Sequence, residues 1–147
     1  MLQLSIITPE RTVYDGEVDQ VTLPTTEGEL TILPHHIPLV STIAPGELRV
    51  RQGGKDVPMV IAGGFLEVLP GNRIAILADD ALRVEELDVA AIEAARERAR
   101  VALIEERHGD DTSFADAAAA LQRELARLRV ARKYRSGSRI HTSETKQ

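Results

Sequence analysis

The stretch ELRVRQ, residues 47–52, shows most clearly how the first half of the chain is patterned. Apolar Leu48 and Val50 alternate with charged Arg49 and Arg51, and this period of two is typical of a β-strand with one buried face. We therefore expect Leu48 and Val50 to point into a core and the two arginines to point toward solvent.

Further strands are predicted on both sides of this stretch. Short runs rich in valine, isoleucine, leucine and threonine occupy residues 2–8, 17–23, 29–33, 38–43, 57–62, 65–69 and 73–78. Turn residues separate them, among them Asp15–Gly16 and Gly63–Gly64, and the second of these predicts a bulge or a tight turn. Many short strands with such turns indicate an antiparallel β-sandwich over residues 1–84. Since no intervening segment is long enough for a crossover helix, a parallel sheet is not expected.

The period of the apolar residues changes near residue 87. Residues 87–108 and 114–134 have the apolar spacing of amphipathic helices. Between them, Gly109 suits a helix C-terminal cap, and Ser113 followed by Asp116 fits a capping box. A connection this short makes two helices antiparallel neighbours, so residues 85–135 are predicted to form a two-helix hairpin. The polar residues 136–147 are expected to be a disordered tail.

The apolar stripes of the two predicted helices are narrow and rich in alanine. They consist of Ile92, Ala95, Ala99, Ala102 and Leu103 in the first helix and of Leu121, Leu125 and Leu128 in the second. Alanine lets helix axes approach closely but buries little apolar surface, which stabilises by only about 25 cal/mol per Å². We therefore expect a hairpin that is weakly held to itself and to the sandwich, and that can detach.

Composition excludes several classes of protein. Of the 147 residues, 43% are hydrophobic and 28% are charged, as is ordinary for a soluble globular protein. The absence of cysteine excludes disulfides and thiolate chemistry and fits a reducing, cytoplasmic location. No apolar run approaches the roughly 20 residues that span a bilayer. A net charge of −5 and an aromatic content of 3% argue against a nucleic-acid partner, although residues 121–147 are rich in basic side chains.

The adjacent histidines His35 and His36 are the first candidates for chemistry. Consecutive residues on a strand point to opposite faces, and no HExxH or HxH pattern accompanies the pair, so a shared metal ion is not expected. The sequence contains no GxSxG nucleophile elbow, no P-loop and no GxGxxG motif. We therefore predict no catalytic residue and no metal site. A metal-dependent, cupin-like enzyme is an alternative that stoichiometric metal in the purified protein would support.

Three longer segments carry more specific information. They are EGELTILPHHIPLV at residues 27–40, GGFLEVLPGNRIAILAD at residues 63–79, and ELDVAAIEAARERAR at residues 86–100, which an arginine-rich helix follows. Together they resemble the epsilon subunit of the F-type proton-translocating ATP synthase, and the resemblance extends from about residue 3 to about residue 133. It implies an N-terminal β-sandwich, a C-terminal helical hairpin, and a subunit that is no enzyme on its own.

The resemblance also implies a place in the central stalk of the synthase. The sandwich would bind the gamma subunit and rest on the membrane c-ring, with Glu29 and His36 on the rim that faces these subunits. The chain would then couple proton-driven c-ring rotation through gamma to ATP synthesis. It would be a peripheral protein at the cytoplasmic face of the cell membrane, in contact with the membrane only through the complex.

The resemblance assigns a regulatory role to the helical hairpin. In the family the hairpin either folds against the sandwich or extends along gamma into the catalytic alpha/beta hexamer, where it blocks ATP hydrolysis. Arg123, Arg127 and Arg129 would then meet an acidic segment of beta. A thin alanine interface is consistent with two states that differ by a few kcal/mol.

Some members of the family bind ATP between the two helices. The matching positions in this sequence are Asp88, Arg98, Arg123 and Arg127. Ala91 stands where the family has an arginine, and Leu82 stands where it has an acidic residue. Because losing one charged phosphate contact costs roughly 1.5–3 kcal/mol, we expect at most weak ATP binding and no resident cofactor.

A function of a different class also fits the residues. The chain could be an adaptor domain, unrelated to the synthase, whose basic helical arm recruits an acidic protein. Formation of a stable one-to-one complex with gamma would separate the two hypotheses.

Overall fold

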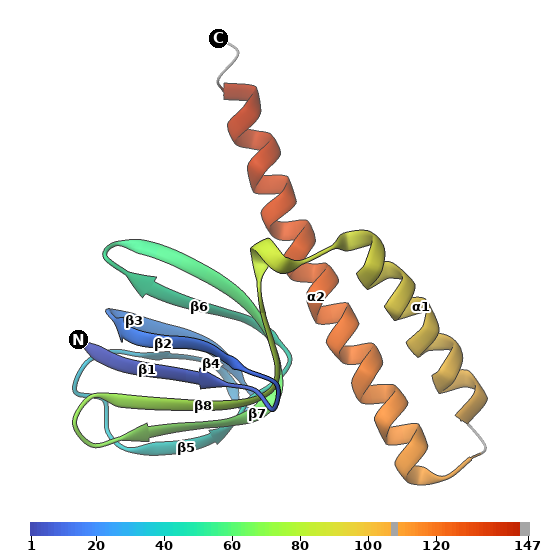
Figure 1. The fold of residues 1–147 in the computed structure, drawn as a ribbon, viewed down its shortest axis with the longest axis horizontal. Helices are drawn as coiled ribbons and strands as arrows, with labels where there is room; N and C mark the ends of the chain where they lie inside the picture. The colour runs from blue at the N-terminus through green and yellow to red at the C-terminus, as the bar shows by residue number, and fades with distance from the viewer. Residues whose placement is uncertain (107–108, 145–147) are drawn as a thin grey trace. The chain divides into compact units, whose positions relative to one another are not determined.

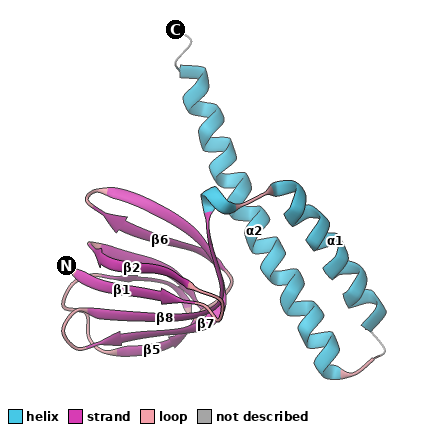
Figure 2. Cartoon of the chain, viewed as in Figure 1, coloured by secondary structure: helices cyan, strands magenta, loops and turns pink. Residues whose placement is uncertain are grey.

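Eight strands form the first unit of the chain, Met1–Arg83, in the computed structural model, which describes residues 1–106 and 109–144 (Figure 1). They are β1 (Leu2–Ile7), β2 (Thr12–Val18), β3 (Gln20–Thr25), β4 (Gly28–Ile32), β5 (Leu39–Thr42), β6 (Gly46–Gln52), β7 (Lys55–Leu69) and β8 (Arg73–Arg83). Neighbouring strands follow the order β2-β1-β8-β7-β6-β3-β4, and β5 pairs with β7. Strands and helices occupy separate parts of the chain (Figure 2), which confirms the predicted β-sandwich followed by helices.

Apolar residues from most of these strands share one core. In β6, Leu48 and Val50 are buried and Arg51 is exposed, as the alternation predicts, whereas Arg49 is half-buried. In this unit the largest fully buried side chains come from β1, β2, β3, β4, β6, β7 and β8 and include Leu4, Leu23, Ile32, Leu48, Leu66 and Ile76. The core therefore depends on strands from the whole unit rather than on one hairpin.

One pair of strands is parallel, contrary to the prediction. β1 and β8 run in the same direction, with Leu4 beside Ile74 and Ile6 beside Ile76. The prediction assumed that parallel strands need a helix to connect them. Here the connection between β1 and β8 consists of the strands β2 to β7. The parallel pairing also sets Ile7, at the end of β1, beside Leu77 of β8.

Glycines lie inside strands at two places where the sequence predicts turns. Gly16 pairs with Leu4 within β2, so Asp15–Gly16 is not a turn. Gly63 and Gly64 lie within β7 at φ angles of +70° and +109°, and the pairing of β7 with β8 keeps one register across them, without a bulge. A Cβ atom on Gly64 would collide with the carbonyl oxygen of Leu77. Glycine is needed here because both the backbone angle and the close approach exclude a side chain.

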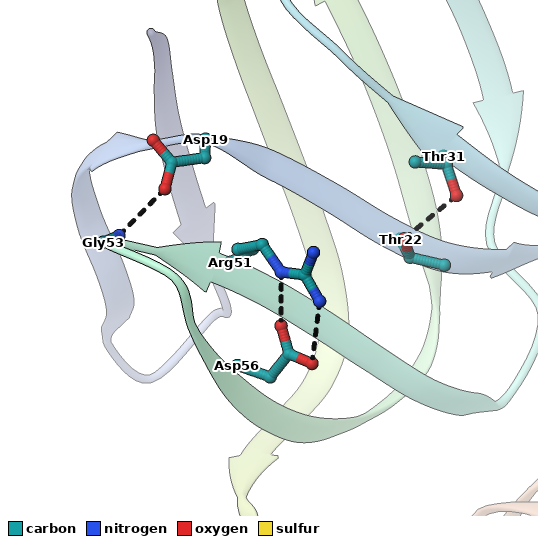
Figure 3. A network of polar contacts seen from close by, with 6 residues as sticks. All are labelled: Asp19, Thr22, Thr31, Arg51, Gly53 and Asp56. Atoms are coloured by element: carbon teal, nitrogen blue, oxygen red, sulfur yellow. Dashed lines mark hydrogen bonds and ion pairs between the residues drawn. The ribbon is translucent and has the colours of Figure 1, made fainter.

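Polar contacts close the turn between β6 and β7 (Figure 3). The Asp19 carboxylate accepts a hydrogen bond from the backbone N–H of Gly53 at 2.8 Å. Arg51 pairs with Asp56, with 3.0 Å between Arg51 Nε and Asp56 Oδ1. The hydrogen bond from Arg51 holds the pKa of the Asp56 carboxyl below its usual range. These contacts fix the position of the turn and belong to the scaffold.

The second unit begins at Val84 and is helical. It contains the short 3-10 helix η1 (Val84–Glu86), α1 (Val89–Glu105) and α2 (Asp111–Glu144), and α1 packs against α2. Asp88 caps α1, because its Oδ1 accepts hydrogen bonds from the backbone N–H groups of Ala90 and Ala91 at 3.1 and 3.3 Å. Figure 1 shows the two helices running in opposite directions, which confirms the predicted hairpin.

The start of α2 differs from the prediction. Asp110, not Ser113, is the capping residue: its Oδ1 accepts a hydrogen bond from Thr112 N–H at 3.3 Å, and its carbonyl accepts one from Phe114 N–H at 3.0 Å. Both residue types cap helices well, and capping at the earlier one adds helical residues while satisfying the same number of free N–H groups.

The end of α2 also differs. Residues 136–144 are helical where the sequence predicts a disordered tail, and residues 145–147 lie outside the described residues, as do residues 107–108 at the end of the predicted first helix. Serine, glycine and threonine lower helix propensity, but extending an existing helix avoids the cost of nucleation, and no proline interrupts this segment. None of the described helices is both long and apolar enough to cross a membrane.

Candidate functional site

The two residues predicted for the subunit-facing rim lie on consecutive parts of the sandwich. Glu29 is an exposed residue of β4, and its carboxylate is 3.6 Å from Arg49 Nη2. His36 lies in the loop between β4 and β5, where its N–H donates to the Leu33 carbonyl at 3.2 Å. Leu33 and Ile37 in the same loop are exposed apolar residues. We call Glu29, Leu33, His36 and Ile37 the rim.

The rim loop is held in a defined shape by one of its histidines. His35 has a φ angle of +70°, which is uncommon for a residue other than glycine. Its N–H donates to the side-chain oxygen of Asn72 at 2.7 Å, and Asn72 itself has a φ angle of +59°. No group of three or more metal-ligating side chains occurs among the residues that the structure describes. The histidines therefore belong to a shaped surface loop.

An exposed apolar patch crosses three neighbouring strands. Leu77 on β8 pairs with Ile7 on β1 and with Phe65 on β7. The exposed fractions are 41% for Ile7, 59% for Phe65 and 56% for Leu77. These residues also line a hollow of about 340 Å³, together with Thr8, Pro9, Gly64, Ala78 and Asp79. Contiguous exposed apolar side chains are typical of a contact surface, and we call Ile7, Phe65 and Leu77 the Leu77 patch.

The Leu77 patch was not predicted from the sequence. Alternation could have placed Phe65 on the outer face, since Leu66 and Val68 point into the core. No local pattern could have joined Ile7 to Leu77, because the two meet only through the parallel pairing of β1 with β8.

The three arginines predicted for the inhibitory contact have different surroundings on α2. Arg129 is exposed. Arg127 Nη1 is 2.9 Å from Glu124 Oε1, and Arg123 Nε is 3.5 Å from the same oxygen. Glu124 is only 3% exposed. The structure thus brings Arg123 and Arg127 together around the Glu124 carboxylate, which was not among the predicted site residues.

The buried row of α2 differs from the predicted leucine stripe. Leu128 is buried as expected, but Leu125 is exposed and Leu121 is half-buried. A row with helical spacing that is buried instead consists of Ala117, Glu124, Leu128 and Ala131. On α1, Ile92 and Ala99 of the predicted stripe are buried.

Of the four residues predicted for an ATP site, Asp88 lies beside a hollow of the helical unit. This hollow of about 630 Å³ is lined by Val84, Leu87, Asp88, Val89, Ala90, Ala131 and Tyr134, and no predicted arginine is among them. The carboxylate of Asp88 caps α1, Arg98 is exposed, and Arg123 and Arg127 contact Glu124. Whether these four residues hold a nucleotide therefore stays a prediction.

Comparisons with known proteins agree with the fold. Residues 1–84 match the sequence family described as the beta-sandwich domain of the ATP synthase Delta/Epsilon chain. The ATP synthase epsilon chain of Dehalococcoides mccartyi is 41% identical over 139 residues, which cover 95% of this chain and 98% of that relative. The epsilon chain of Syntrophobacter fumaroxidans is 47% identical over 132 residues, covering 90% and 96%. The chain belongs to the ATP synthase epsilon chain family.

A chain of a solved ATP synthase structure has a similar fold. A chain of the Euglena gracilis mitochondrial ATP synthase, in a cryo-EM structure that includes the c-ring, matches with a TM-score of 0.70 and 28% identity. The match covers 85% of this chain and 78% of that chain. The family predicted from the sequence is therefore confirmed, whereas the roles of Glu29, His36, Arg123, Arg127 and Arg129 stay predictions.

Proposed function

We propose that the chain is a non-catalytic rotor subunit in the central stalk of a proton-translocating ATP synthase, coupling c-ring rotation through gamma to ATP synthesis. The observation that carries the proposal is similarity to ATP synthase epsilon chains over 90–95% of this chain. A similar chain is part of a solved synthase assembly with a c-ring. A subunit of this kind transmits torque through its contact surfaces and needs no catalytic residue.

The Leu77 patch is the surface that we assign to gamma. Its three apolar side chains lie on paired strands of a rigid sheet, so they present a fixed contact area. Burying such side chains in a complex removes apolar surface from water, which favours association. The glycine at position 64 keeps the strands beneath the patch close together.

The rim is the surface that we assign to the c-ring. Glu29 and His36 supply polar contacts, while Leu33 and Ile37 supply exposed apolar ones. The shape of the loop is set by His35 and Asn72, so the rim is organised before it meets a partner. The chain would then be peripheral, at the cytoplasmic face of the membrane, and would reach the membrane through the complex alone. No nucleic acid is among the proposed partners.

Co-purification with the gamma subunit tests the proposal. We expect a stable one-to-one complex when the two chains are produced together and the mass of the eluted species is measured by light scattering. Separate elution of two well-folded chains would contradict the proposal and would favour the adaptor function, in which the basic arm recruits an unrelated acidic protein.

The helical unit is assigned to restraint of ATP hydrolysis in the alpha/beta hexamer. Two observations support this assignment: the chain divides into two compact units at Val84, and the helices bury few large apolar side chains. Such an element can adopt two positions of similar free energy. Basic residues of α2, including Arg123, Arg127 and Arg129, would then contact an acidic surface of the hexamer.

Replacing Arg129 with glutamine should weaken the restraint of hydrolysis about two- to fivefold at low ionic strength, since an exposed charge pair contributes modestly and is screened by salt. ATP hydrolysis by the assembled enzyme, measured between low and high salt, checks this. Lys55→Gln is the matched control, because it removes one exposed positive charge from the sandwich. Equal salt dependence of the two variants would rule out an electrostatic contact at Arg129.

Bound nucleotide has no part in the proposed mechanism. Asp88 already caps α1 through its carboxylate, and Ala91 offers no cation at the position where some family members have an arginine. Any ATP binding by this chain should therefore be weak.

A further inference from the structure

Glu124 is a buried carboxylate that neither proposed contact surface uses. It lies in the buried row of α2, seven residues after Ala117, and the same spacing separates buried Ile92 and Ala99 on α1. Matching spacings of this kind are expected where two antiparallel helices pack in register. An acidic residue thus occupies a position where an apolar side chain would pack well.

The contacts of Glu124 are concentrated on one oxygen. Its Oε1 is 2.9 Å from Arg127 Nη1 and 3.5 Å from Arg123 Nε. Its Oε2 is buried and has no hydrogen-bond partner among the described residues. A buried carboxylate is tolerated only when nearby charges compensate for its lost hydration, and here two guanidinium groups do so.

We infer that Glu124 is an internal acidic partner that holds Arg123 and Arg127 while the hairpin is closed and releases them when it opens. The inference rests on the proposed function, because it supposes an acidic surface outside the chain that the arginines meet. Arg129, which is exposed, is not controlled in this way.

The contact between Glu124 and the arginines is strong only while Glu124 is buried in the closed hairpin. In the closed hairpin the side chains of Glu124 and Arg127 are only 5% and 17% exposed, so their opposite charges attract strongly in a medium of low dielectric, whereas Arg123, at 42%, stays partly hydrated. In an opened arm the same residues, one and three positions apart on one helix, would be hydrated, and an exposed pair at that spacing is weak and screened by salt. Opening therefore makes two arginines available at the moment when the arm can reach its partner.

Replacing Glu124 with glutamine in the full chain tests the inference. Glutamine keeps the shape but cannot neutralise the arginines, so the closed hairpin should open more often. We expect amide hydrogen exchange within α1 to become at least about tenfold faster, because removing one partner of a buried ion pair is strongly destabilising. In the assembled enzyme, the concentration of chain that half-maximally restrains hydrolysis should fall about three- to tenfold.

Asp116→Asn is the matched control, since it removes an exposed carboxylate from the same helix and should change neither measurement. Exchange in the sandwich strands reports whether each variant is folded. Unchanged exchange in α1 of Glu124→Gln, or faster exchange without stronger restraint, would overturn the inference. A different result would show that the proposed function itself is wrong: removal of residues 84–147 would leave ATP hydrolysis unchanged, whatever residue stands at position 124.

Discussion

Replacing Leu77 with glutamate should weaken binding of the chain to the gamma subunit about 100-fold, because a few central apolar residues carry most of the affinity of an interface. The leucine side chain is 56% exposed and is flanked on paired strands by Ile7 and Phe65. A carboxylate at this position would have to lose its hydration on docking without gaining a partner. In the free chain it would stay hydrated, so the sandwich itself should remain folded.

Titration calorimetry of the variant chain against gamma measures this effect. Val101→Glu is the matched control, since Val101 is an exposed apolar residue of α1 and the substitution introduces the same charge outside the Leu77 patch. We expect the control to bind gamma as the unmodified chain does. Equal affinities of Leu77→Glu and the unmodified chain would show that gamma docks elsewhere on the sandwich.

The strands of the sandwich could be predicted largely because their faces differ. Where apolar and polar residues alternate, as in 47–52, burial on one face follows from the sequence alone. The turns predicted at Gly16 and at Gly63–Gly64 were wrong, because these glycines lie inside strands. The local sequence around a glycine is compatible with a turn or with a strand. Here pairing with a strand distant in sequence keeps these glycines within strands.

Less of the proposed contact surfaces than of the fold follows from the sequence. Glu29 and His36 came from a family resemblance, whereas the Leu77 patch depends on a parallel strand pairing that no short-range pattern reveals. When a surface is formed by strands that are far apart in sequence, its residues can be predicted only if the pairing register of those strands is known.

For the helices, the sequence did not predict correctly which face of α2 is buried. Two neighbouring faces of α2 have nearly the same period. One contains the leucines at positions 121, 125 and 128, and the other contains Ala117, Glu124 and Ala131. Hydrophobicity favours the leucines, but tertiary packing buries Glu124 and leaves Leu125 exposed. The capping role of Asp88 was open to prediction, because aspartate directly before a helix commonly caps it.

Removing the helical unit should separate the two halves of the proposed function. The sandwich has its own core and closes with Arg83, whose guanidinium lies over the Tyr14 ring at 5.8 Å and donates to the Val13 carbonyl at 3.5 Å. A chain ending at Arg83 should therefore fold and bind gamma. It should lack the arm that we assign to restraint.

ATP hydrolysis by the assembled synthase carrying residues 1–83 in place of the full chain is the most direct test of the account. We expect hydrolysis to rise about fivefold or more, as for the loss of a coupling worth about 1 kcal/mol or more, while gamma binding is retained. Hydrolysis equal to that of the enzyme with the full chain, in a sample where the truncated chain is bound to gamma, would contradict it.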